Sequence, residues 1–142
     1  MRRTIILASL FALGAGVALA QSSAIEQRKA KFKEMGGAAG PIGKMMRGEE
    51  AFDLAKVQSG LKTIQANAKV LPTLFPPDSK TGDTKALPAI WENKAKFDAI
   101  FPKLEAAAGA ALTAVKDEAT MKAEMPKVLG NCGGCHNDFR AK

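Results

Sequence analysis

Apolar residues along the chain recur at steps of three and four, a spacing that places side chains on one face of an α-helix. The first such stripe consists of Ile25, Phe32, Met35, Ala39, Ile42 and Met46. Glycines from Gly36 to Gly43 weaken this segment, since each interior glycine costs about 1 kcal/mol of helix propensity relative to alanine. The pattern predicts either one helix that packing holds together or two shorter helices separated near Pro41.

A second stripe predicts a helix that begins after Asp53, a residue type suited to the N-cap, and stops at Pro72. Its apolar members are Leu54, Val57, Leu61, Ile64, Ala68 and Leu71. The segment 71–87 that follows is rich in turn-forming residues and is longer than an ordinary connection. Loops of this length are usually functional or mobile.

Two more stripes follow the loop. The third predicted helix begins at Pro88, which suits a first helical turn, and should kink at Pro102. Its inner positions are Phe97, Phe101, Leu104, Ala108, Ala111 and Val115. The fourth stripe consists of Met121, Met125, Val128, Cys132, Cys135 and Phe139. Four helical stretches without strand alternation predict an all-α protein.

The cysteines of the fourth stripe belong to the sequence Cys132-Gly133-Gly134-Cys135-His136, the C-x-x-C-H pattern typical of c-type haem attachment. Positions i, i+3 and i+4 share one face of a helix, so both thiols and the imidazole should lie on the same side. In such a site two thioether bonds fasten the porphyrin edge and the adjacent histidine ligates iron. We therefore predict one covalently bound haem c.

Other readings of the two cysteines are weaker. A redox-active C-x-x-C pair belongs near a βαβ pattern, and none is visible in this sequence. A structural zinc needs four ligands, but the chain has two cysteines and one histidine. A disulfide between such close neighbours would stabilise almost nothing, because stabilisation grows with loop length.

The predicted haem and the predicted core occupy the same place, since the cysteines lie on the stripe that faces inward. Four helices around a buried, flat cofactor indicate an antiparallel four-helix bundle with covalently attached haem near the C-terminus.

The first 20 residues are typical of a secretory signal peptide. Arg2 and Arg3 precede an uncharged run, and Ala18-Leu19-Ala20 forms an A-x-A cleavage site before Gln21. The run is shorter than the roughly 20 apolar residues of a membrane-spanning helix and contains many small residues. We expect cleavage after residue 20, which leaves residues 21–142 as one domain with no membrane anchor.

The net charge of the protein limits the classes of binding partner that the sequence predicts. The formal net charge is +7, and loss of Arg2 and Arg3 lowers it to +5 because residues 1–20 contain no acidic residue. Excess lysine on an exported protein either keeps the surface soluble or docks an acidic partner. No basic block or alternation of aromatic and basic residues occurs, so nucleic acid is not an expected partner.

Four stretches of the chain together resemble the class II cytochromes c, the cytochrome c′ family. They are residues 28–32, residues 47–53, residues 89–98 with Ile90-Trp91, and residues 132–140 with the terminal Phe139-Arg140. The C-x-x-C-H pattern alone occurs in every c-type cytochrome, but its position at the C-terminal end is specific to this group. The resemblance implies a bacterial protein exported to the periplasm, and it leaves open a homodimer joined through the first two helices.

The resemblance also implies roles for individual residues. His136 would be the proximal iron ligand, and Cys132 and Cys135 the thioether anchors. Arg28 would lie near a haem propionate, and Arg140 beside the proximal imidazole. For both arginines the simpler reading is an ordinary exposed side chain.

Trp91 is most simply a core residue, although the family would place it against the haem edge. The family places Phe32 over the distal face of the iron. Some relatives carry a methionine there, whose thioether binds iron and gives a six-coordinate, low-spin electron carrier. A phenylalanine has no donor atom and leaves the iron five-coordinate.

Two functions therefore stay open. In one, a five-coordinate haem binds small diatomic gases, nitric oxide foremost and carbon monoxide, and exchanges electrons. In the other, Met35 one turn after Phe32 ligates the iron, and the protein is a six-coordinate electron shuttle among periplasmic redox partners. We do not expect an enzyme, because the sequence offers no second histidine and no paired general acid and base.

Overall fold

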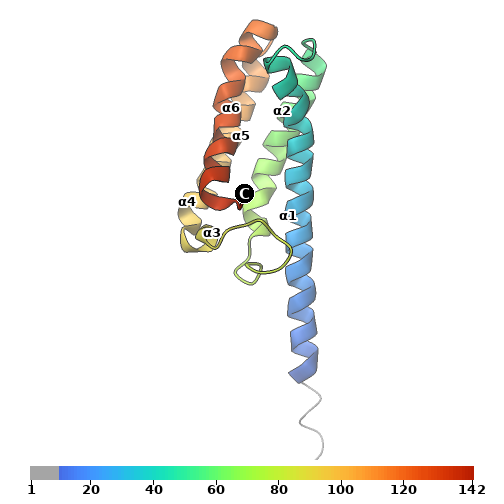
Figure 1. Cartoon of the computed structure of the whole chain (residues 1–142), viewed down its shortest axis with the longest axis vertical. Helices are drawn as coiled ribbons and strands as arrows, with labels where there is room; N and C mark the ends of the chain where they lie inside the picture. The colour runs from blue at the N-terminus through green and yellow to red at the C-terminus, as the bar shows by residue number, and fades with distance from the viewer. Residues whose placement is uncertain (1–9) are drawn as a thin grey trace, which may run out of the picture.

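The structure is a computed structural model that describes the backbone of residues 10–142 and the side chains of residues 23–142. Its four long helices are α1 (Leu10–Met46), α2 (Leu54–Val70), α5 (Ile100–Ala114) and α6 (Glu118–Phe139). They pack side by side as a bundle (Figure 1). Three short helices and a loop gather at one end: η1 (Leu71–Leu74), the loop that follows it, α3 (Ala89–Glu92) and α4 (Lys94–Asp98). The predicted all-α four-helix bundle is confirmed.

Helix α1 is continuous, so the alternative of a break near Pro41 is wrong. Close packing holds the segment: Ile42 is fully buried, and a Cβ added at Gly60 of α2 would lie 2.9 Å from its Cδ1 and 3.0 Å from the carbonyl oxygen of Ala38. The two backbones meet closely because Gly60 has no side chain. Met45 is buried at the end of this stripe, whereas the predicted Met46 is only half-buried.

Helix α2 begins as its sequence predicts. The side chain of Asp53 accepts a hydrogen bond of 3.0 Å from the backbone N–H of Lys56 and so caps the helix. The helix ends at Val70, and Pro72 lies inside the 3-10 turn η1 that continues it. The first part of the predicted loop is therefore a helical turn.

The third predicted helix is wrong as a single element, since it is divided into α3, α4 and α5. The helix does not kink at Pro102 as expected. The break lies earlier, between α4 and α5, and Pro102 is in the first turn of α5, where its missing N–H costs nothing. A proline ring clashes with the carbonyl four residues before it, and that residue, Asp98, is the last of α4.

Helix α6 runs without interruption through the two glycines of the cysteine motif. The helix begins with a capping box. The Asp117 carboxylate accepts a hydrogen bond from the Thr120 N–H, and the Thr120 hydroxyl oxygen accepts one from the Asp117 N–H. At the other end, residues 85–87 pair with the last residue of the helix and with the chain that follows it. Leu87 donates to the carbonyl of Phe139, and Ala141 donates to the carbonyl of Lys85. These bonds tie the loop to the helix that carries the motif.

Aromatic side chains form the core at the loop end of the bundle. Phe97 lies at the centre, with ring centroids 4.7 Å from Phe75, 5.1 Å from Phe101 and 5.3 Å from Phe139, all edge to face. Such pairs add about 0.5–1.5 kcal/mol each beyond the area they bury. The cluster joins the loop, α4, α5 and α6 into one support beneath the motif. Among the described residues, no helix is long and apolar enough to cross a membrane.

Candidate functional site

A cavity of about 760 Å³ opens between α1, the loop, α5 and α6. Its inner walls are buried apolar side chains: Met35, Ile64, Phe75, Ile90, Phe97, Phe101, Leu104 and Phe139. Its rim is exposed and includes four basic side chains: Lys29, Lys33, Lys85 and Arg140. A volume of this size with apolar walls and a few polar groups is typical of a cofactor site.

Helix α6 brings Cys132, Cys135 and His136 to one wall of this cavity. Both thiols are partly buried and form no disulfide. Burial raises the pKa of Cys132, and burial with the nearby Cys132 raises the pKa of Cys135 to about 11. Both groups are therefore uncharged at neutral pH, whereas a redox-active pair depends on a thiolate of low pKa.

The zinc alternative also lacks support. No cluster of three or more histidine, cysteine, aspartate or glutamate side chains within the described residues could hold a metal ion. A planar, largely apolar macrocycle fixed by two thiols and one imidazole suits this donor set and these walls better than a four-ligand site does.

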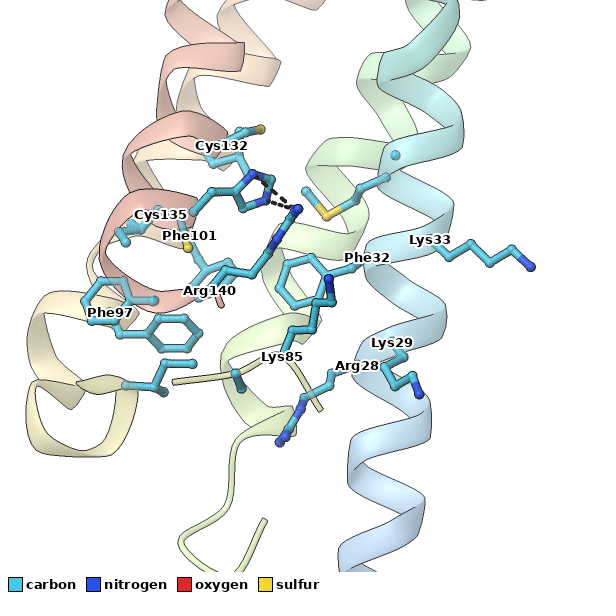
Figure 2. A pocket seen from close by; sticks show the side chains of 18 of the residues that line it. Arg28, Lys29, Phe32, Lys33, Lys85, Phe97, Phe101, Cys132, Cys135 and Arg140 are labelled. Atoms are coloured by element: carbon cyan, nitrogen blue, oxygen red, sulfur yellow. Dashed lines mark hydrogen bonds between the residues drawn. The ribbon is translucent and has the colours of Figure 1, made fainter. Parts of the chain in front are cut away.

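Arg140 lies one turn after His136, with its guanidinium beside the imidazole. A terminal guanidinium nitrogen of Arg140 is 3.4 Å from both ring nitrogens of His136 (Figure 2). Partial burial and the positive charge of Arg140 lower the pKa of His136. The imidazole therefore stays neutral at neutral pH, and a neutral nitrogen is the form that can ligate a metal.

Phe32 enters the cavity from α1, on the wall across from the cysteine motif (Figure 2). Its ring contacts Phe75 edge to face, with centroids 6.4 Å apart. Met35 lines the same wall and is 8% exposed, so both candidates for the distal position face the cavity. Met45 and Met46 do not line it.

Arg28 is buried, with 2% of its surface exposed. Its guanidinium donates to the hydroxyl and the carbonyl of Ser79 at 2.8 and 2.9 Å, and to the Thr84 hydroxyl at 3.0 Å. The same group lies over the Phe75 ring, 4.6 Å from its centroid. Burial lowers the pKa of Arg28, since no carboxylate within the described residues pairs with it. It is a fixed positive charge that holds the loop against α1.

Trp91 does not line the cavity. It packs against Phe75 with ring centroids 6.0 Å apart, and its indole N–H donates to the carbonyls of Phe75 and Pro76. The structure thus gathers six of the seven expected site residues at one cavity and leaves Trp91 outside it. Sequence reasoning missed the rim lysines; Lys29 and Lys33 adjoin Arg28 and Phe32 in sequence, whereas nothing local marks Lys85.

A helical bundle that presents C-x-x-C-H to a large apolar cavity defines a c-type haem protein. The family described as Cytochrome C′ matches residues 23–140. The chain is 57% identical to cytochrome c′ of Rhodopseudomonas palustris over 99% of this chain and 97% of that protein. It is 38% identical to cytochrome c-556 of Agrobacterium fabrum over 99% of this chain and 96% of that protein.

A solved structure of cytochrome c′ from Rhodopseudomonas palustris has the same fold. It aligns with a TM-score of 0.81 and 59% sequence identity, over 84% of this chain and 96% of that one. The chain therefore belongs to the cytochrome c′ family, and the resemblance read from its sequence is confirmed. The predicted haem c is confirmed as its cofactor.

Proposed function

We propose that this protein is a periplasmic haem protein with five-coordinate iron that binds small diatomic gases and exchanges electrons. The observation that carries the proposal is the position of Phe32, which faces the cysteine motif across the cavity and has no donor atom. When bound, haem c supplies an iron centre able to take up a gas molecule and to change oxidation state. The greater identity to a cytochrome c′ than to a cytochrome c-556 also supports this choice.

Each residue of the site would have a separate role in binding the cofactor. Cys132 and Cys135 would hold the cofactor by its edge, and His136 would bind the iron through a nitrogen that Arg140 and partial burial keep unprotonated. Phe32 would cover the opposite face. The apolar walls would exclude water from that face, so that a small uncharged gas competes well for the open position.

A specific observation supports a second candidate. Met35 is buried and lines the cavity one turn after Phe32, so its thioether could reach the iron if α1 were rotated slightly. The protein would then be a six-coordinate, low-spin electron shuttle. Its identity of 38% to a cytochrome c-556 leaves this alternative to be tested.

The spin state of the iron separates these candidates. We expect ferric and ferrous spectra of the purified protein to be predominantly high-spin. Replacing Phe32 with alanine should accelerate carbon monoxide association about tenfold, the factor that removal of about 1.4 kcal/mol of barrier gives. Replacing it with methionine should shift the spectrum toward low-spin.

Phe52→Ala is the matched control, since Phe52 is half-buried in the turn between α1 and α2 and does not line the cavity. It should leave the rate and the spectrum unchanged. A low-spin spectrum of the unmodified protein that becomes high-spin only in Met35→Ala would establish the second candidate instead.

We also propose that residues 1–20 are removed on export, so that the working protein is residues 21–142. Residues 1–9 of this signal peptide lie outside the described residues. Support comes from the A-x-A site and from the family match, which begins at residue 23. Intact mass of protein purified from a haem-exporting bacterium should correspond to a chain starting at Gln21 with one haem. A mass that includes residues 1–20 would contradict cleavage.

A further inference from the structure

Most of the chain's net charge lies around one cavity. Five basic side chains and one carboxylate line it, a net of four positive charges: Arg28, Lys29, Lys33, Lys85, Arg140 and Asp83. Residues 21–142 carry a formal net charge of +5, so the rest of that segment is almost neutral. The two carboxylates of a haem would cancel at most half of this local surplus. A positive field therefore surrounds the mouth of the site.

The exposed members of this group, Lys29, Lys33, Lys85 and Arg140, form the basic rim. Within it, the Lys33 side chain extends outward from α1, away from the cysteine motif (Figure 2). The four residues come from three elements, because α1 supplies two, the loop one and the end of α6 the fourth (Figure 2). Lys33 and Lys85 are exposed and have no ion-pair partner within the described part of the chain. Lys29 pairs with Asp83. Seven lysines elsewhere stand in ion pairs, whereas others, such as Lys62 and Lys103, have no ion-pair partner within the described residues. The rim is therefore distinguished by the number of basic side chains that line one cavity.

The place of the rim decides what it can recognise. The rate of electron transfer falls steeply with distance, so a partner must cover the point where the cofactor comes nearest to solvent. In this molecule that point is the mouth of the cavity, because its inner walls are buried apolar side chains. We propose that the basic rim is the docking surface for an acidic electron-transfer protein, an inference that rests on the proposed electron exchange.

An anionic membrane fits the rim less well. Helices that lie on membranes combine basic residues with apolar anchors that enter the lipid. Among the described residues the only large hydrophobic side chain that is well exposed is Val70, and it does not line the cavity. A recessed, basic mouth without apolar anchors suits a protein surface that carries carboxylates.

The test compares two charge-reversed proteins in their haem-loaded form. One carries Lys29→Glu and Lys85→Glu, which reverse two rim charges at the loop side of the cavity. The control carries Lys62→Glu and Lys103→Glu, which are exposed, have no ion-pair partner in the described residues and do not line the cavity. The two variants have the same net charge, so only the place of the charge differs. Unchanged optical spectra would show that the haem site is intact in both variants.

Reduced flavodoxin, a small acidic electron carrier, is the protein probe, and ferricyanide and tris(phenanthroline)cobalt(III) are probes of opposite charge. At an ionic strength of about 0.01 M, the rim variant should react with flavodoxin about tenfold more slowly than the unmodified protein. It should also react more slowly with ferricyanide and faster with the cobalt complex. The control variant should change each rate less than twofold, and high salt should remove the differences.

Equal slowing in both variants would overturn the proposal, because net charge and not the rim would then control the rate. Rates that neither variant changes would overturn it as well. Binding to anionic phospholipid vesicles that only the rim variant loses, with unchanged flavodoxin rates, would assign the rim to a membrane instead. If the unmodified protein exchanges electrons with none of the probes, the proposed electron exchange fails, and the docking surface fails with it.

Discussion

Replacing both Cys132 and Cys135 with serine should give a chain whose haem passes completely into acidified acetone, while the unmodified protein should release none. The reason is chemical, since a thioether requires sulfur and the chain has no cysteine besides these two. Intact mass should show the matching loss of one haem from the polypeptide. Haem that stays with the doubly substituted chain after extraction would show that another group anchors it.

The same variant should lose stability when its haem is removed. Without haem, the apolar side chains around the cavity of about 760 Å³ have no group to pack against, and each Å² of apolar surface left in contact with water costs about 25 cal/mol. The chain must therefore admit water to the cavity, collapse it or unfold. We expect a large loss of helical circular dichroism.

His136→Ala is the control for the extraction experiment, because both thioethers remain in it. Its haem should resist extraction although its optical spectrum changes.

Replacing Arg28 with alanine should lower the free energy of unfolding of the haem-loaded protein by about 3–5 kcal/mol. The guanidinium is buried and makes its contacts with Ser79, Thr84 and the Phe75 ring, so its removal leaves a void and buried oxygens without donors. Hydrogen bonds to charged groups contribute about 1.5–3 kcal/mol each. Chemical denaturation followed by circular dichroism measures the loss, and the loop around Ser79 should become sensitive to proteases.

Arg47→Ala is the matched control for this prediction. Arg47 is exposed, and within the described residues its one ion pair is with Glu49, two residues away, so its loss should cost less than about 1 kcal/mol. Arg28→Lys should not restore full stability, because a lysine cannot reproduce the forked geometry that reaches Ser79 and Thr84 together. Equal denaturation midpoints for the unmodified protein and Arg28→Ala would show that the loop does not depend on this side chain.

The long helices could be predicted because local chemistry specifies them. Asp53 caps α2, and the apolar steps of three and four lead to residues that are buried, such as Val57, Leu61 and Ile64. The continuity of α1 through Pro41 could not be predicted in this way. It depends on the close approach of Gly60, which lies 19 residues later in the chain and contacts α1 only in the folded state.

The same distinction between local and long-range contacts applies to the residues of the candidate site. The positions of Cys132, Cys135 and His136 follow from spacing on one helix, and helical spacing also places Phe32 beside Arg28. The contacts of Arg28 with Ser79 and Thr84 join segments about 50 residues apart and have no local signature. Lys85 reaches the cavity for a similar reason, since the pairing of its loop with the chain after α6 carries it there.

The bundle has two unlike ends, and this difference matters for attaching the protein to a surface. The loop, the short helices and the C-terminus all lie at the cavity end (Figure 1). The turn from α1 to α2 and the turn from α5 to α6 lie at the opposite end. A cysteine-free linker or an affinity tag placed in the exposed turn near Gly48 would therefore immobilise the molecules on an electrode with every cavity facing the solution. A C-terminal tag would instead turn the cavities toward the electrode surface.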